Sequence, residues 1–306
     1  MKIFLILLQL VFFILISPFL SGLITKIKNN LRMRKGQSVL QPYYNLVKLF
    51  SKGQVVSETA SWIFRAAPII VISSTLTASL LIPVFIFSPS INHMGDFFAL
   101  VFIFGLARFF IVLAALDAGS SFGGMGSSRE MFISSLAEPV ICLVVFAMSL
   151  QFGSTNVLAF SGSHVISASS IVAAFALFLV TIAETSRIPI DNQETHLELT
   201  MVHEAMVLEY SGRSLFFIEL SGYIKQMILF FLIAQIIFPV FLPDFINFQS
   251  VFLWGLWYLS RIFIIVFITA LVEVSVAKMR LFRAADFLGF AFVLGIIACV
   301  CAILGV

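Results

Sequence analysis

The sequence predicts an all-α integral membrane protein, a bundle of eight transmembrane helices with an amphipathic interfacial helix in the first cytoplasmic loop. Three observations predict this fold. The 306 residues are 61% hydrophobic and only 11% charged, with a mean hydropathy of +1.12, which is too apolar for a soluble fold of this length. Apolar runs long enough to cross a bilayer recur along the chain. Lys and Arg gather in alternate loops.

The apolar runs are continuous rather than alternating, which indicates helices and not the strands of a barrel. A bilayer core takes roughly 20 apolar residues per helix, and the chain offers eight such segments. Together they predict a single membrane domain over 1–306. The expected spans are about 3–24, 68–88, 97–116, 131–151, 164–184, 219–242, 250–272 and 286–305.

The distribution of basic residues predicts the orientation. Fifteen of the 18 Lys and Arg lie in, or at the edge of, the loops that follow spans 1, 3, 5 and 7, and the other three loops have none. Basic loops stay in the cytoplasm, so both termini are expected to face outward. The net charge of +3 thus follows from topology, with the lipid bilayer and not nucleic acid as the partner.

The stretch LQPYYNLVKLFSK, 40–52, predicts the interfacial helix. Apolar and polar side chains separate onto two faces at helical spacing, and Pro42 suits a first helical turn. One interpretation is a surface anchor with its apolar face toward lipid or neighbouring helices. The other is that this helix forms the wall of a cavity or contacts a partner.

Charged residues inside the spans are costly and need a reason, at roughly 2.5–3.5 kcal/mol each. Arg108 and Glu138 lie on neighbouring antiparallel spans, each ~10–12 Å below the cytoplasmic end at ~1.5 Å per residue. We therefore expect them to face each other or to share a polar cavity; the alternative is separate structural hydrogen bonds. Pro139 can open the helix beside Glu138. Arg261 is a further buried charge in span 7.

Carboxylates crowd into the third cytoplasmic loop, between spans 5 and 6. If 194–209 is helical, Glu194, Glu198 and Glu209 form one acidic stripe. A solvated face, a metal site with His196, His203 and Glu204, and a proton-collecting or partner-docking surface all remain open. The metal site is disfavoured because seven residues separate the histidines, too far for i,i+4 chelation.

Redox chemistry within the chain is not expected. Its three cysteines lie in apolar runs without a C-x-x-C pattern, and its four histidines lie in loops or at helix ends. The Gly-rich stretch GSSFGGMGSS, 119–128, is interpreted as a flexible turn, with a capping box at Ser127 and Glu130 opening the next helix. No cofactor or catalytic site is predicted.

Three loop motifs carry a resemblance to a known family: RKGQSVLQPYYNLVKLF from 34, the segment ARFF to LAEP over 107–139, and AETSRIPID followed by THLELTMVHEAMVLEYSGR over 183–213. Over almost its whole length the chain resembles the complex I subunit 1 family. The details favour the branch found in membrane-bound nickel–iron hydrogenase complexes of the formate hydrogenlyase and hydrogenase-4 type.

The resemblance implies a membrane-anchoring, proton- or sodium-coupling subunit of an oxidoreductase in a bacterial or archaeal cell membrane. Its implied partners are soluble hydrogenase-like large and small subunits, an iron–sulfur subunit and antiporter-like membrane subunits. Carried over residue by residue, the ion-coupling positions are Glu138, Glu184, Arg187, Asp191, Glu194, Glu198, Glu204 and Glu209, with Arg108 added from the pairing argument.

Two other functions are considered. Quinone-reducing members of the family have a longer basic stretch where this chain reads RMRKGQSVLQPYYN, which weakens the case for a quinone site. A bound quinone would decide for that function. A free-standing secondary transporter is the other alternative, and it would be stable and active when purified alone.

Overall fold

The computed structural model describes residues 2–57, 60–82, 84, 95–157, 167–191, 201–238, 248–279 and 281–305. These residues form helices, with no strand beyond one bridge between Asp96 and Asn156. The helices are α1 (Lys2–Leu31), α2 (Gln41–Ser51), α3 (Trp62–Leu81), α5 (Phe97–Asp117), α6 (Ser121–Phe152), α7 (Ala168–Glu184), α8 (His203–Val207), α9 (Gly212–Ile237), α10 (Phe248–Ser275) and α11 (Leu281–Leu304).

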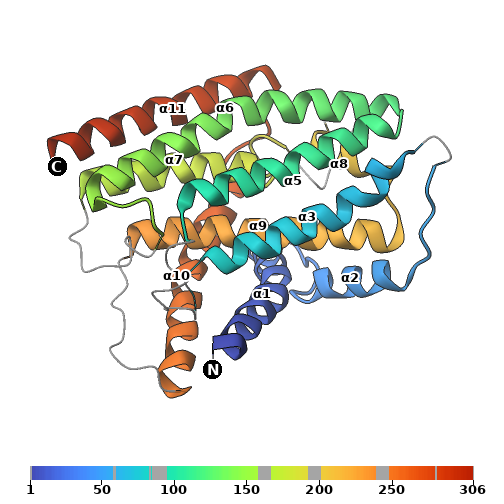
Figure 1. The fold of residues 1–306 in the computed structure, drawn as a ribbon, viewed down its shortest axis with the longest axis horizontal. Coiled ribbons are helices and arrows are strands. Elements are labelled where there is room, and N and C mark those ends of the chain that lie inside the picture. The colour runs from blue at the N-terminus through green and yellow to red at the C-terminus, as the bar shows by residue number, and fades with distance from the viewer. Residues whose placement is uncertain are drawn as a thin grey trace.

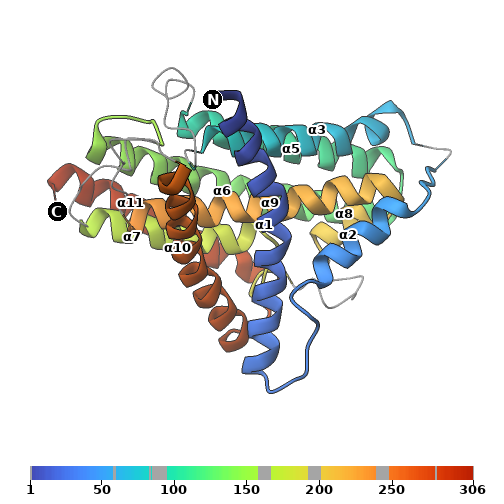
Figure 2. The same ribbon diagram turned by 90° about the horizontal axis from the view of Figure 1, so that it is seen from below.

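Seven of the described helices are long and apolar enough to cross a membrane, and α7, with 17 residues, is a shorter apolar helix. The predicted all-α membrane bundle is therefore confirmed. Figure 1 shows α3, α5, α6, α7, α9 and α11 running side by side, while α1 and α10 cross them steeply as a neighbouring pair (Figure 2).

The centre of the bundle is α9, which contacts α1, α2, α3, α7 and α10. In its most apolar 18-residue segment 78% of the residues are buried, against 28–50% in the other six long helices. Those helices keep lipid-facing surfaces, whereas α9 is covered by protein on most sides. A charged side chain on α9 therefore points into the molecule and must find polar partners there.

Several helices begin earlier than the sequence patterns predict, among them α9 at Gly212 instead of residue 219 and α11 at Leu281 instead of residue 286. Caps explain the early starts of two others. The second span was expected from residue 68, but α3 begins at Trp62, because the Ser61 side chain accepts a hydrogen bond from the backbone N–H of Ile63 and caps the helix. The fourth was expected from residue 131, with a flexible turn and a Ser127 cap before it. Instead α6 begins at Ser121, capped by Ser120, so the Gly-rich stretch is largely helical.

The predicted amphipathic helix is confirmed as α2. Tyr44 and Val47 on its apolar face are exposed, as expected of a side that meets lipid. Leu46 on the other side is buried, and Pro42 and Asn45 line an internal cavity. The helix thus combines both interpretations left open by the sequence: an apolar outer face and a cavity wall.

We call the end of the bundle where α5 and α7 finish and α6 and α9 begin the basic end, because its loops hold most of the Lys and Arg. The short α8 and the Gly-rich start of α6 meet there. A Cβ on Gly126 would lie 2.9 Å from Cβ of Ala205 and 3.0 Å from the carbonyl oxygen of Val202. Glycine is therefore needed at this position because the backbone of the α8 segment packs directly onto α6.

Candidate functional site

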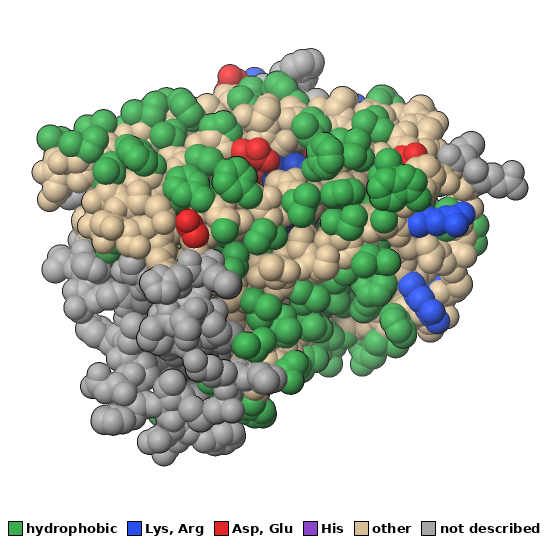
Figure 3. Space-filling model, viewed as in Figure 1, with side chains coloured by type: hydrophobic (Ala, Val, Ile, Leu, Met, Phe, Trp, Pro, Cys, Tyr) green, Lys and Arg blue, Asp and Glu red, His purple; other side chains and the backbone are tan. Residues whose placement is uncertain are grey.

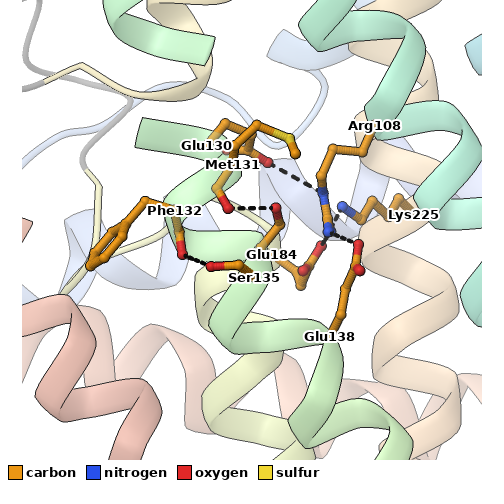
Figure 4. Close-up of polar contacts among 9 residues, drawn as sticks. Arg108, Glu130, Met131, Phe132, Ser135, Glu138, Glu184 and Lys225 are labelled. Carbon is orange, nitrogen blue, oxygen red and sulfur yellow. Dashed lines mark hydrogen bonds and ion pairs between the residues drawn. The ribbon is translucent and has the colours of Figure 1, made fainter. Parts of the chain in front are cut away.

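A cluster of five charged side chains lies between α5, α6, α7 and α9 (Figure 4). Arg108 is at its centre. Its Nη1 is 2.5 Å from Oε1 of Glu138, its Nη2 contacts the carboxylate of Glu184, and its Nε is 3.6 Å from Oε1 of Glu130. Lys225 on α9 approaches Glu184 from the other side, with Nζ 2.6 Å from Oε2. The predicted pairing of Arg108 with Glu138 is present in this geometry.

Burial differs sharply within this Arg108 cluster. The Glu184 side chain is 3% exposed and the Arg108 side chain 7%, whereas 45% of the Glu138 side chain is exposed on the flank of the bundle. Three carboxylates face two cations, so the cluster has a formal charge of −1 when all its members are ionised. One negative charge of the cluster is therefore not balanced by Arg108 and Lys225.

The end of α7 folds Arg187 back into the bundle. The N–H of Ser186 donates to the carbonyl of Ala183, and the N–H of Arg187 donates to the carbonyl of Ile182. This is the Schellman pattern of helix termination, with Ser186 in the left-handed region at φ 50° where glycine is usual. The chain reverses at once, so that Arg187 returns beside α7 instead of pointing toward water.

A second cluster forms around Glu273 of α10. Its Oε1 lies 2.5 Å from Nη1 of Arg187, and its Oε2 lies 3.2 Å from Nζ of Lys28 on α1. Nη2 of Arg187 also donates to Oε1 of Gln226 on α9, at 3.0 Å. All four side chains are buried. One carboxylate faces two cations, so this Glu273 cluster has the opposite charge excess of +1.

One cavity of about 380 Å³ connects the two clusters. Arg108, Glu184 and Lys225 line it on one side, and Arg187 and Glu273 on the other. Its wall also includes His203 and Glu204 of α8, Glu219 and Tyr223 of α9, and Asp191. A space of this volume, lined by so many polar groups, can hold several ordered waters that bridge them.

Beyond the Arg108 cluster the interior becomes apolar. A second void of about 10 Å³, roughly the room for one water, lies beside the cluster, and Leu100, Phe104, Ile141 and Leu232 are among its walls. The exposed edge of Glu138 is the polar group next to this void that also reaches the outer surface.

Asp191 fastens the beginning of the third loop to its end. One carboxylate oxygen accepts a hydrogen bond from the N–H of Val202 at 3.1 Å, and the other lies 3.1 Å from Nζ of Lys278. The carbonyl of Pro189 accepts a bond from the N–H of Met279. The loop is thereby attached to the segment between α10 and α11.

The hypothesis of one helix over 194–209 is wrong for its described part. Helix is present only over His203–Val207, and Glu209 follows it as an exposed side chain. Glu194, Glu198 and His196 lie outside the described residues. The interruption at Val202 has a cause: its N–H is bound by Asp191 instead of entering a helical ladder.

The LEYSG motif is an anchor for this loop. The Tyr210 ring stacks on Phe64 of α3 with centroids 4.0 Å apart, and its hydroxyl donates to the carbonyl of Phe64 at 3.0 Å. Burial raises the pKa of the Tyr210 phenol, so it stays a hydrogen-bond donor. Gly212 has φ +53°, and a Cβ there would lie 2.4 Å from the carbonyl oxygen of Gly53. The motif joins the first and third loops through close packing.

The structure brings six of the sequence-predicted residues to one cavity or its edge: Arg108, Glu138, Glu184, Arg187, Asp191 and Glu204. Glu209 lies apart, on the surface. Five further members of the two clusters were not selected from the sequence: Glu130, Lys225, Lys28, Glu273 and Gln226. Of these, Glu130 was interpreted as a capping residue.

The fold and the site define a class: a helical membrane protein whose apolar bundle encloses a cavity lined by paired charges. A family model described as NADH dehydrogenase matches residues 3–304. The chain belongs to this family, the complex I subunit 1 family, and it is a membrane subunit of the complex I-like and hydrogenase-like type.

Named relatives include proteins of both kinds. Hydrogenase-4 component C of Escherichia coli is 30% identical over 239 residues, 77% of this chain and 74% of that protein. Formate hydrogenlyase subunit 4 of the same organism is 30% identical over 233 residues, 74% of each chain. NADH-ubiquinone oxidoreductase chain 1 of Emballonura alecto is 28% identical over 229 residues, 71% of this chain and 70% of that one.

The fold also matches a solved structure. A chain of the membrane-bound sulfane sulfur reductase, an archaeal respiratory membrane complex, superposes with a TM-score of 0.83 at 17% identity, covering 98% of this chain and 99% of that one. At this identity the match supports the fold. It extends over the whole bundle and not only over the region of the cavity.

Proposed function

We propose that the chain anchors a soluble hydrogenase-like redox arm to the membrane and couples the electron transfer of that arm to ion movement. The observation that carries the proposal is the charged cavity, which extends from α8 at the basic end to the Arg108 cluster within the bundle. Buried ion pairs contribute little net stability, because desolvation offsets their attraction. Two such clusters on one cavity therefore favour a functional role.

Docking of the arm is proposed for the basic end, which is cytoplasmic under the positive-inside rule. The exposed carboxylate of Glu209 and the exposed Leu208 lie there on a segment held tightly by Tyr210. Glu194 and Glu198 belong to the same loop by sequence. A rigidly held loop with charged and apolar side chains suits a surface that a soluble subunit must find in one orientation.

A neighbouring membrane subunit is proposed for the flank where Glu138 emerges. On the face formed by α5 and α6, acidic side chains stand among hydrophobic ones (Figure 3). The side chains of Phe102 and Leu106 on this face are exposed, as is typical of contact with lipid or another helix. A carboxylate at this depth is costly in lipid. An antiporter-like subunit that offers a hydrogen-bond donor would remove that cost and continue the ion path laterally.

The role of the cavity can be tested by a substitution that fills part of it. Gly222 lies on the wall, and no heavy atom comes within 4 Å of a Cβ added there, so a larger side chain has room and would point into open space. We expect Gly222→Leu to insert and assemble normally while ion movement per electron transferred falls several-fold. The measurement is hydrogenase-type activity together with a pH- or sodium-sensitive dye in vesicles that contain the purified complex.

Gly289→Leu is the matched control. This glycine is exposed on α11, a Cβ there also meets nothing within 4 Å, and the residue does not line the cavity. We expect it to behave as the parent in both measurements. Equal coupling in the two leucine variants would contradict the proposal that the cavity carries ions.

A quinone-reducing function is the second candidate, favoured by relatives whose names describe NADH-ubiquinone and NADH-quinone oxidoreductases. Extraction of the purified complex with organic solvent decides between the two. A stoichiometric quinone would favour this second function, and its absence together with normal activity would favour the hydrogenase-like arm. Activity of the chain purified alone would instead indicate a free-standing transporter.

A further inference from the structure

Arg261 of α10 is a buried cation that belongs to neither charged cluster. The residue is 2% exposed. Arg108 and Arg187 each pair with at least one carboxylate, whereas no Asp or Glu of the described residues forms an ion pair with Arg261. A buried charge without an opposite charge is costly. The surroundings of Arg261 must therefore stabilise it in another way.

Three neutral groups stabilise the guanidinium of Arg261. Its Nη1 donates to the carbonyl of Phe238 at 2.6 Å. This carbonyl is at the C-terminal end of α9, where backbone oxygens carry partial negative charge. The guanidinium carbon also lies 4.5 Å from the ring centroid of Tyr258 and 5.9 Å from that of Trp257, within reach of cation–π attraction. Dipoles and ring faces hold a cation without cancelling its charge, so the positive field of Arg261 persists.

Arg261 lies away from the large cavity, on the boundary where α1, α9 and α10 contact one another (Figure 2). We call this boundary the seam, and we assign to it Ser17 of α1, Gln235 of α9 and Arg261 of α10. Glu273, which lines the cavity, is 12 residues after Arg261 on the same helix, about 18 Å at 1.5 Å per residue. The seam therefore extends from the cavity toward the end of the bundle opposite the basic end.

Buried polar groups continue along the seam beyond the cavity. Ser21 of α1 lines the cavity, and Ser17 follows one turn further from the basic end. Ser17 is three turns before Lys28 and shares its face of α1, the face on which Lys28 pairs with Glu273 of α10. Gln235 is 1% exposed on α9, one turn before the end of that helix.

Unsatisfied atoms indicate water in the seam. Ser17 is 1% exposed and its hydroxyl has no hydrogen-bond partner within the described structure. Nε and Nη2 of Arg261 are buried donors that likewise lack an acceptor there. Buried polar atoms are nearly always satisfied, and an ordered water is the usual partner when the protein offers none. Water at these atoms would prolong the wet space of the cavity along the seam.

We infer that Arg261 is a charge barrier, which allows the seam to hold water and prevents cations from crossing the bundle along it. A fixed positive charge in a low-dielectric interior repels protons and metal cations alike. A guanidinium is suited to this role because it does not lose its proton inside proteins. A carboxylate partner would cancel the field, whereas the Phe238 carbonyl and the Tyr258 ring leave it in place.

The barrier is tested by passive leak, which does not depend on the proposed function. Vesicles that contain the purified complex without substrates receive a potassium diffusion potential, and an enclosed pH-sensitive dye reports proton entry. Arg261→Gln should raise the rate of proton entry at least several-fold over the parent. Arg261→Lys keeps a positive charge and should stay close to the parent. Arg283→Gln removes an exposed arginine of α11 and is the control that should change nothing.

A chloride-sensitive dye in the same vesicles separates a lost barrier from a packing defect. A gap in the protein admits anions as well as cations, whereas loss of a positive charge favours cations only. An unchanged chloride rate in Arg261→Gln therefore supports the inference. Equal rises of the proton and chloride rates, or a leak in Arg261→Lys as large as in Arg261→Gln, would overturn it.

Gln235→Glu decides the case even if Arg261→Gln fails to assemble. This variant keeps Arg261 and its bond to Phe238 and places a carboxylate of the same shape as the amide one turn before that bond. The carboxylate should pair with the guanidinium and cancel its field, so the proton rate should rise several-fold with no rise in the chloride rate. A Gln235→Glu complex as tight to protons as the parent would show that the charge of Arg261 is not what closes the seam.

Discussion

Removal of the Arg108 charge should destabilise the bundle more than removal of any one of its acidic partners. Arg108→Gln leaves Lys225 facing three carboxylates, and the formal charge of the cluster changes from −1 to −2. The loss of one partner from a buried ion pair costs about 3–5 kcal/mol. Glu184, at 3% exposure, belongs to that class, whereas Glu138, at 45%, is partly solvated or covered by a partner. We therefore expect most of the loss of stability in Arg108→Gln to come from the broken ion pair with Glu184.

A double variant separates charge balance from packing. Arg108→Gln with Glu184→Gln restores the formal charge of −1, since Lys225 then faces Glu130 and Glu138. The double variant should regain part of the lost stability, with a coupling energy of about 1–3 kcal/mol, as measured for residues in one network. Glu184→Gln alone leaves two cations and two carboxylates, so we expect a smaller loss than for Arg108→Gln.

The parent, the two single variants and the double variant are compared by denaturant titration of the purified complex in mild detergent. The midpoint and slope of each titration give the free energy of unfolding. Arg283→Gln is the control, because it removes an exposed arginine at the start of α11 and should change stability by no more than about 0.5 kcal/mol. If Arg108→Gln behaved like this control, or if the two single effects simply added in the double variant, the electrostatic account of the cluster would be wrong.

Three further outcomes are expected. Gly212→Ala should lower stability by more than about 1 kcal/mol in the same titration, because it places a Cβ at positive φ, 2.4 Å from a carbonyl oxygen; an unchanged midpoint contradicts this packing. Gly126→Leu should release the α8 segment from α6 and speed proteolytic cleavage after Met201, and an unchanged cleavage rate would exclude that contact as the anchor. In a chain without native cysteines, a membrane-impermeant thiol reagent outside the cell should label Ser154→Cys and not Ser121→Cys; the reverse pattern inverts the topology.

Patterns that depend on composition alone predicted much of the fold. The eight apolar runs correspond to seven long helices and the shorter α7, because burial in lipid requires length and apolarity, which can be counted along the chain. The pairing of Arg108 with Glu138 followed from equal depth on neighbouring antiparallel spans, a relation between adjacent segments. Both inferences needed only local or sequential information.

Contacts between distant segments were missed. Nothing near Lys225 in the sequence indicates its contact with Glu184, 41 residues earlier. The Gly-rich stretch suggested flexibility. Position 126 instead has no room for a side chain, because Ala205 of α8, 79 residues later in the chain, packs against it. Asp191 binds the N–H of Val202 just before α8 begins at His203, a contact that periodicity cannot reveal. Each miss is a tertiary contact that overrides a local preference.

The opposite charge excesses of the two clusters suggest how the cavity responds to a proton. The Arg108 cluster carries −1 and the Glu273 cluster +1, and both border one polar space attached to α9 through Lys225 and Gln226. Under the proposed function, a proton that reaches the Arg108 cluster would neutralise the excess charge of that cluster and remove its attraction for the Glu273 cluster. Because α9 is packed on most sides, small rotations of its two polar side chains are the cheapest response that it can make. Water order along α9, and not movement of the helix, is therefore the element that we expect to change as a proton passes.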